Sequence, residues 1–168
     1  MRWLLILLFA LPLAATAQQA PFDCSESATH RQFDFWLGEW EVRDSEGKLQ
    51  GNNRISAVQK GCALEEQWRS IRGGTGQSIN YYDPRNGQWH QLWTDAGASI
   101  IDISGKLVDG SMVLEGEIYY LSRDVKMPFR GTWTPLDDGR VRQFFQEQDR
   151  QGKWQTWFEG FYQKTDAD

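Results

Sequence analysis

The sequence predicts an all-β protein, a closed antiparallel β-barrel of about ten strands with a short N-terminal helix capping one end. Two observations predict the strands: beyond Gly38 the hydrophobic pattern has a period of two, and turn residues such as Asp and Gly recur between the alternating segments. A third observation predicts closure, because ten short strands without a second helical layer leave no other element to cover the sheet edges.

The start of the chain carries the features of a secretory signal peptide. Arg2 precedes an apolar run, and the small residues at 15–17 form a cleavage motif, so we expect cleavage near Ala17. The apolar run is shorter than the ~20 residues that a membrane span needs. We therefore expect an exported protein, periplasmic or secreted, with a signal peptide at 1–17, a flexible lead at 18–26 and a single barrel domain at 27–168.

Residues 27–37 are expected to form the capping helix. Ser27 suits the N-cap position, and Gly38 suits the C-terminal stop. Phe33 and Trp36 are three positions apart and would share one face of a helix. That aromatic face would close one mouth of the barrel.

The strands follow the helix in an unbroken series. Turn sequences such as Asp109-Gly110 supply residues that tolerate positive φ where a hairpin needs them. Short strands joined by tight hairpins are typical of a meander in sequence order. We expect strands at 39–45, 49–58, 62–70, 76–83, 88–95, 98–105, 111–119, 127–135, 140–148 and 153–163.

The charge and the cysteines narrow the possible partners. The chain has a formal net charge of −5, which argues against nucleic acid and anionic membranes as partners. In an oxidising compartment its two cysteines, Cys24 and Cys62, are expected to form a disulfide. The alternative is a metal site made by both cysteines with His30 and His90, but their spacing matches no zinc pattern, so no metal is predicted.

Six segments resemble, in order, an uncharacterised bacterial family of barrel proteins similar to lipocalins and other calycins. They are FDFWLGEWEV at 33–42, GCALEEQW at 61–68, SINYYDP at 78–84, WHQLWTD at 89–95, RGTWTPLDDG at 130–139 and WFEGFY at 157–162. The resemblance implies a calycin-like barrel and names no reaction. A more distant resemblance is to nitrobindin-type ten-stranded barrels, which bind haem. No histidine here matches the proximal ligand of that group, so no cofactor is predicted; haem becomes an alternative if His90 faces inward.

Several strand faces mix aromatic side chains with amides and charges, which is typical of a ligand-holding interior. Arg130 is expected to lie inside, where it would pair with Glu66 or Glu147 or bind a carboxylate of the ligand. The predicted lining comprises Glu66, Trp68, Asn80, Tyr82, Trp89, Gln91, Trp93, Arg130, Gln143, Glu147 and Trp157.

The leading hypothesis is an exported protein that binds a small apolar or amphipathic molecule inside the barrel. Three alternatives stay open. Side chains can fill such a barrel completely. A buried Glu66 or Glu147 of raised pKa, acting with a tyrosine, would suit an isomerase or hydrolase. Outward-facing aromatics would suit an envelope protein–protein interaction module, including a homodimer.

Overall fold

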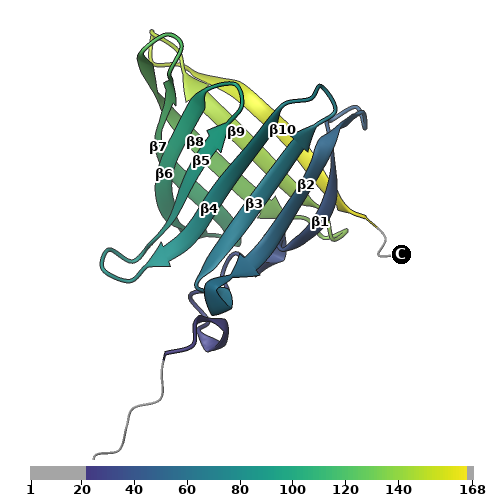
Figure 1. Ribbon diagram of the computed structural model, residues 1–168, viewed down its shortest axis with the longest axis vertical. Coiled ribbons are helices and arrows are strands. Elements are labelled where there is room, and N and C mark those ends of the chain that lie inside the picture. Colours follow the sequence, from purple (N-terminus) through teal and green to yellow (C-terminus); the bar gives the residue numbers. More distant parts are fainter. Residues whose placement is uncertain (1–21, 166–168) are drawn as a thin grey trace, which may run out of the picture.

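The protein is a closed barrel of ten antiparallel strands, described for residues 22–165 in a computed structural model (Figure 1). Each strand pairs with the next in sequence, and β1 pairs with β10 to close the ring. The predicted signal peptide at 1–17 and residues 18–21 of the predicted lead lie outside the described residues. The strands are β1 (Gly38–Arg43), β2 (Leu49–Val58), β3 (Ala63–Ser70), β4 (Thr75–Asp83), β5 (Gln88–Asp95), β6 (Ser99–Val108), β7 (Ser111–Tyr120), β8 (Val125–Pro135), β9 (Val141–Gln148) and β10 (Trp154–Lys164).

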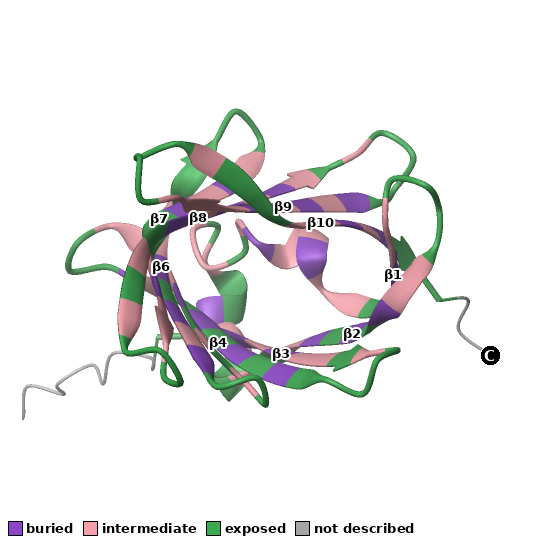
Figure 2. Ribbon diagram, turned by 90° about the horizontal axis from the view of Figure 1, so that it is seen from above, coloured by how far each residue is buried: buried purple, intermediate pink, exposed green. Residues whose placement is uncertain are grey.

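The strands have one face turned inward and one turned to solvent. Buried and more exposed residues alternate along them, which Figure 2 shows as bands of colour around the ring. In β4, for example, Ser78 and Asn80 are buried whereas Ile79 between them is exposed. The predicted fold class, an all-β closed antiparallel barrel, is therefore confirmed, and the strands occur in the predicted order.

The predicted helix over 27–37 is wrong. The segment before β1 contains hydrogen-bonded turns and two short 3-10 helices, η1 (Cys24–Glu26) and η2 (Asp34–Trp36). An isolated helix of about three turns is marginal in water, so tertiary packing decides the conformation of such a segment. Here the packing partners are aromatic: Phe33 stacks on Trp36 with ring centroids 5.0 Å apart, and both rings also pack against Trp133.

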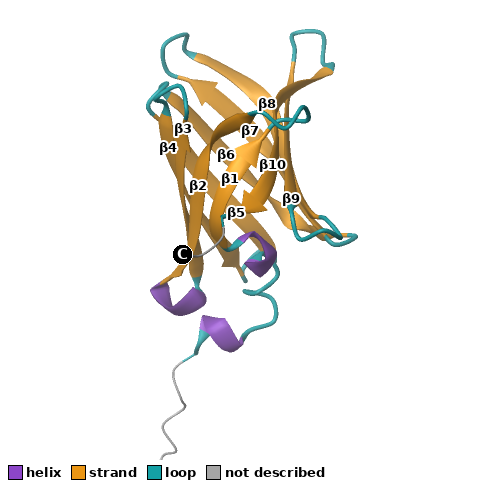
Figure 3. Ribbon diagram, turned by 90° about the vertical axis from the view of Figure 1, so that its right-hand side faces the viewer, coloured by secondary structure: helices purple, strands orange, loops and turns teal. Residues whose placement is uncertain are grey.

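The segment nevertheless occupies one end of the barrel, which we call the closed end. Phe33 and Trp36 are fully buried there, and the ring of Phe33 meets Trp89 edge to face at 5.7 Å. Figure 3 shows the helical turns together at this end. The hairpin loops at 44–48, 71–74, 96–98, 121–124 and 149–153 surround the opposite, open end.

A disulfide fastens the N-terminal segment to the barrel. Cys24 in η1 is bonded to Cys62, which follows η3 (Gln59–Gly61) and precedes β3, so the predicted pairing is confirmed. A Cβ atom at Gly61 would lie 3.1 Å from the backbone of Ser25, because the two segments approach closely. The described part of the predicted lead is thus covalently attached to the domain. None of the helices in residues 22–165 is long and apolar enough to span a membrane.

Candidate functional site

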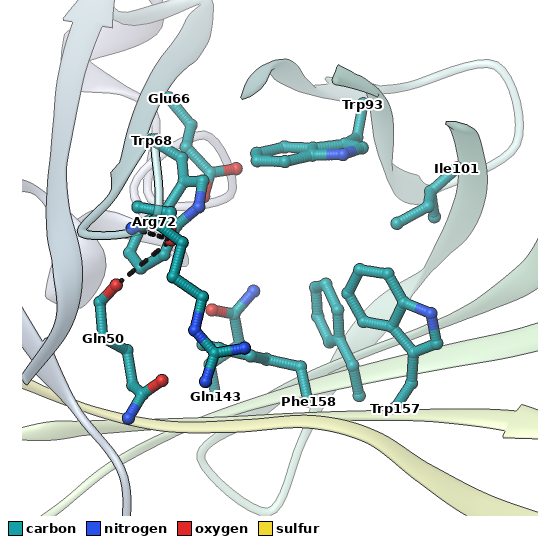
Figure 4. A pocket seen from close by; sticks show the side chains of 11 residues that line it. Gln50, Glu66, Trp68, Arg72, Trp93, Ile101, Gln143, Trp157 and Phe158 are labelled. Atoms are coloured by element: carbon teal, nitrogen blue, oxygen red, sulfur yellow. Dashed lines mark hydrogen bonds between the residues drawn. The ribbon is translucent and has the colours of Figure 1, made fainter. Parts of the chain in front are cut away.

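A cavity of about 250 Å³ lies inside the barrel at its open end. Five aromatic side chains form most of its wall: Trp68, Trp93, Phe145, Trp157 and Phe158. Figure 4 shows these rings, except that of Phe145, labelled around a common space. Glu66 and Gln143 supply buried polar groups, and the exposed Arg72 lies at the rim in the β3–β4 loop.

Glycines explain why the two tryptophans from β3 and β5 leave space in the middle. A Cβ atom at Gly51 would lie 2.6 Å from the ring of Trp68, and one at Gly76 would lie 2.1 Å from the ring of Trp93. Each indole therefore packs against the backbone of a neighbouring strand, where any larger residue would displace it. The rings cover the barrel wall and do not cross its centre.

The same arrangement recurs on the other side of the cavity. A Cβ atom at Gly131 would lie 2.6 Å from the ring of Phe145, and one at Gly160 would lie 2.8 Å from the ring of Phe158. Four of the five aromatic wall residues thus pack on glycines whose missing side chains make room for a ring.

Trp157, the fifth aromatic residue, enters the wall through an irregularity in β10. The β9–β10 register shifts between Thr156 and Phe158, so Trp157 and Phe158 both contribute to the cavity although they are adjacent in sequence. The indole nitrogen of Trp157 donates to the Tyr120 hydroxyl at 3.0 Å. That hydroxyl in turn donates to Glu147, and burial together with this bond raises the pKa of Tyr120 to about 12.

Glu66 is a buried carboxyl group held by neutral donors. The Asn53 amide donates to one of its oxygens at 2.6 Å, and the Ser78 hydroxyl donates to the other at 2.7 Å. Burial raises the pKa of Glu66 to about 7, and the two hydrogen bonds act in the opposite direction without cancelling the effect. At neutral pH the group can therefore gain or lose a proton.

The hydrogen bonds continue from Glu66 across the interior. Asn53 also donates to the hydroxyl of Tyr162 at 2.9 Å, and this hydroxyl donates to Gln143 at 2.5 Å. On the other side, Asn80 donates to Ser78 at 2.8 Å and accepts from Gln91 at 2.9 Å. Burial holds the pKa of Tyr162 well above its ordinary value, so Tyr162 stays a neutral donor.

The structure separates the predicted lining residues into groups. Five of them line the cavity: Glu66, Trp68, Trp93, Gln143 and Trp157. Asn80 and Gln91 are buried in the hydrogen-bond network next to Glu66. Glu147 lies beside the cavity, on Tyr120.

Tyr82 and Trp89 lie at the closed end, away from the cavity. The Trp89 indole donates to the side chain of Gln32 at 3.3 Å, and Tyr82 packs edge to face on His30 at 5.4 Å. Both side chains therefore contact the N-terminal segment. They are part of the packing that closes the barrel.

The predicted interior position of Arg130 is wrong. Its neighbours Phe129 and Gly131 are buried, so the alternation of β8 directs Arg130 outward. On the outer surface its guanidinium donates to Gln146 at 2.7 Å and lies over the ring of Trp154 at 4.2 Å. It can pair with neither Glu66 nor an interior ligand.

Several cavity residues escaped the sequence prediction. Phe158 escaped because a strict period of two places it opposite Trp157, and only the register shift brings both inside. Arg72 lies in a loop, where alternation carries no information. Phe145 shares a strand face with Gln143, so alternation along the strand predicts that both side chains point into the barrel.

Compared with protein-family models and with curated proteins, the chain matches none of them. The ten-stranded antiparallel barrel is consistent with a calycin-like fold. The resemblance to a particular family within that fold stays a prediction.

Proposed function

We propose that the protein is an exported binding protein that holds a small apolar or amphipathic molecule in the cavity at the open end of the barrel. The observation that carries this proposal is the aromatic cavity itself, walled by rings packed on glycines and bordered by the buried Glu66 and Gln143. Apolar walls with a few placed polar groups are typical of ligand sites. Export is supported by the signal-peptide features and by the Cys24–Cys62 disulfide, which suits an oxidising compartment.

The size of the cavity indicates the size of the ligand. About 250 Å³ is slightly below the roughly 300–1,000 Å³ range of common small-molecule sites. A body of one or two rings suits this volume. Burying such a body contributes about 25 cal/mol per Å² of apolar surface before the costs of ordering the ligand.

Binding is tested with protein stripped of co-purified molecules. Aromatic amines and alcohols, fatty acids and haem are titrated against it, with tryptophan fluorescence and thermal unfolding as readouts. We expect saturable quenching and a raised Tm for ligands with one or two rings, because Trp68 and Trp93 border the cavity. Absence of both effects across the panel would overturn the proposal.

A matched pair of glycine variants assigns binding to the cavity. Gly76→Ala places a methyl group where the Trp93 ring lies, so the ring must move toward the cavity. Gly74→Ala is the control, because its Cβ would meet nothing closer than 3.9 Å. We expect G76A to bind the best ligand at least ~10-fold more weakly, a loss of about 1.4 kcal/mol, and G74A to bind like the unaltered protein.

The raised pKa of Glu66 favours a second candidate, an enzyme that uses this carboxyl as a general acid or base. A carboxyl with a pKa of about 7 suits proton transfer at neutral pH. The test is turnover of hydrolase and isomerase substrates by the unaltered protein and by Glu66→Gln. An enzyme would lose turnover in E66Q while still binding an uncharged ligand.

A further inference from the structure

The cavity contains a buried acidic group with no cation beside it among the described residues. Around Glu66, the inward-facing neighbours are Asn53 on β2, Ser78 on β4, Gln143 on β9 and Tyr162 on β10. Tyr162 is the one titratable group of these four, and it is neutral. β5 and β6 contribute Trp93 and Ile101 to the cavity, neither of which titrates.

The charged residues nearest this cavity do not neutralise Glu66. Arg72 lines the exposed rim of the same cavity, where water screens its charge, and no cation contributes to the pKa of Glu66. Glu147 is itself an acid and accepts the hydrogen bond of Tyr120. Burying a carboxylate without a partner is costly, and this cost is why Glu66 holds its proton up to about neutral pH.

The aromatic wall has the same electrostatic preference as Glu66. The face of an indole ring is electron-rich, so it attracts cations and repels anions. Trp68, Trp93 and Trp157 all line the cavity that contains the carboxyl of Glu66. Glu66 on β3 and Trp93 on β5 lie at the same level on either side of Ser78, and Figure 4 shows the Trp93 ring extending toward the carboxyl group of Glu66.

We propose that the molecule bound in this cavity carries a protonated amine, and that its ammonium group binds against the carboxylate of Glu66 beside the indole rings of Trp68 and Trp93. This inference rests on the proposed binding function and specifies the class of ligand. The apolar body of the amine packs on the aromatic wall. The ammonium group supplies the positive charge that the neutral donors Asn53 and Ser78 do not bring to Glu66.

Amine binding then depends on pH in a defined direction. Only the ionised carboxylate attracts the ammonium group, and burial sets the pKa of Glu66 at about 7 in the empty protein. Affinity for the amine is therefore greatest above pH 7. It falls as the pH drops below 7, by up to about tenfold per pH unit. A neutral ligand of the same shape shows no such dependence.

The test uses three probes that share a naphthyl body: naphthylethylamine, naphthylethanol and naphthylacetate. Their affinities for the full protein are measured by calorimetry at pH 8. We expect the amine to bind at least ~10-fold more tightly than the alcohol, and the carboxylate to bind most weakly. Glu66→Gln should lose at least ~10-fold for the amine and little for the alcohol. Glu65→Gln is the matched control, because Glu65 lies on the other face of β3.

The outcomes separate the two proposals. If the alcohol binds as tightly as the amine and E66Q changes neither affinity, the amine inference is overturned while the binding function stands. If none of the three probes binds, the proposed binding function and the amine inference both fail for ligands of this size. Should E66Q not fold, the unaltered protein decides the question: an amine affinity that stays constant between pH 5 and pH 8 would overturn the inference.

Discussion

Glu66 sets the chemistry of the interior because it is an acid surrounded by neutral groups. Asn53 and Ser78 satisfy its oxygens, yet neither brings a positive charge. The pKa of about 7 therefore reflects burial that hydrogen bonds only partly offset. An acid whose folded pKa is raised takes up a proton on folding between its unfolded pKa and its folded pKa. The folded state is then favoured by low pH within this window.

The first prediction is a pH dependence of stability that belongs to this residue. Between the unfolded value of 4.5 and about 7, the folded protein binds more protons than the unfolded one, so stability falls as the pH rises through this window. The shift corresponds to at most about 3 kcal/mol of unfolding free energy. Urea unfolding at pH 5 and pH 8 measures it, and Glu66→Gln should remove most of the difference. An equal pH effect in both proteins would contradict the role of Glu66.

Arg130 shows that alternation along a strand determines whether a side chain points into or out of the barrel. Phe129, Gly131 and Trp133 alternate along β8 and are all buried, so the aromatic residues of this strand share its inward face and Arg130 lies on the other face. Outside the barrel, Arg130 stacks on Trp154 of β10. A guanidinium can cover an exposed indole at little cost, whereas inside it would need a carboxylate partner.

At the scale of the strands, glycines opposite aromatic rings shape the interior. Gly51, Gly76, Gly131 and Gly160 each lie in a strand, and each is in contact with a ring that would clash with a Cβ atom. The rings closest to Gly51, Gly76 and Gly131 belong to neighbouring strands, so the role of these three glycines could be recognised only once the strand register was known. Phe158 instead precedes Gly160 by two positions in the same strand.

The second prediction concerns Gly131, where a Cβ would lie 2.6 Å from Phe145 and 3.0 Å from Trp133. Overpacking of this kind typically costs about 1–3 kcal/mol because the rings must leave their rotamers. We expect Gly131→Ala to lower the unfolding free energy by about that amount in urea titrations. Gly74→Ala, with open space around its Cβ, should remain within about 0.5 kcal/mol of the unaltered protein. Equal stability of the two variants would refute the steric account.

The elements differ in how far local sequence determines them. The strands were predictable, since alternation and turn residues such as Asp109-Gly110 act over a few positions, and both residues do have positive φ. The conformation of the segment before β1 was not predictable, because it is the one that brings the rings of Phe33 and Trp36 into contact with the ring of Trp133, which is distant in sequence. The register shift beside Trp157 likewise depends on pairing with β9, which no local pattern encodes.

At the scale of the whole molecule, the two ends of the barrel have separate tasks. The closed end is filled by aromatic packing and tied by the Cys24–Cys62 disulfide, and the open end contains the cavity. A perturbation at one end is therefore expected to leave the other largely intact.

The third prediction uses this separation. Replacing both Cys24 and Cys62 with serine opens a loop of 38 residues, which should lower stability by about 3–4 kcal/mol on the chain-entropy account. Ligand affinity of the folded double variant should change less than twofold, because the cavity residues are untouched. Urea unfolding and calorimetry test the two statements separately. A large loss of affinity with unchanged stability would show that the ends are coupled.

Both limits of the described chain emerge at the closed end. Phe22 precedes the disulfide-linked turn, and Thr165 donates its backbone N–H to Glu39 at the start of β1. Protein attached to a sensor chip at the closed end would therefore have the open end of its barrel directed toward the solution. An analyte could then reach Trp68 and Trp93 without meeting the linker.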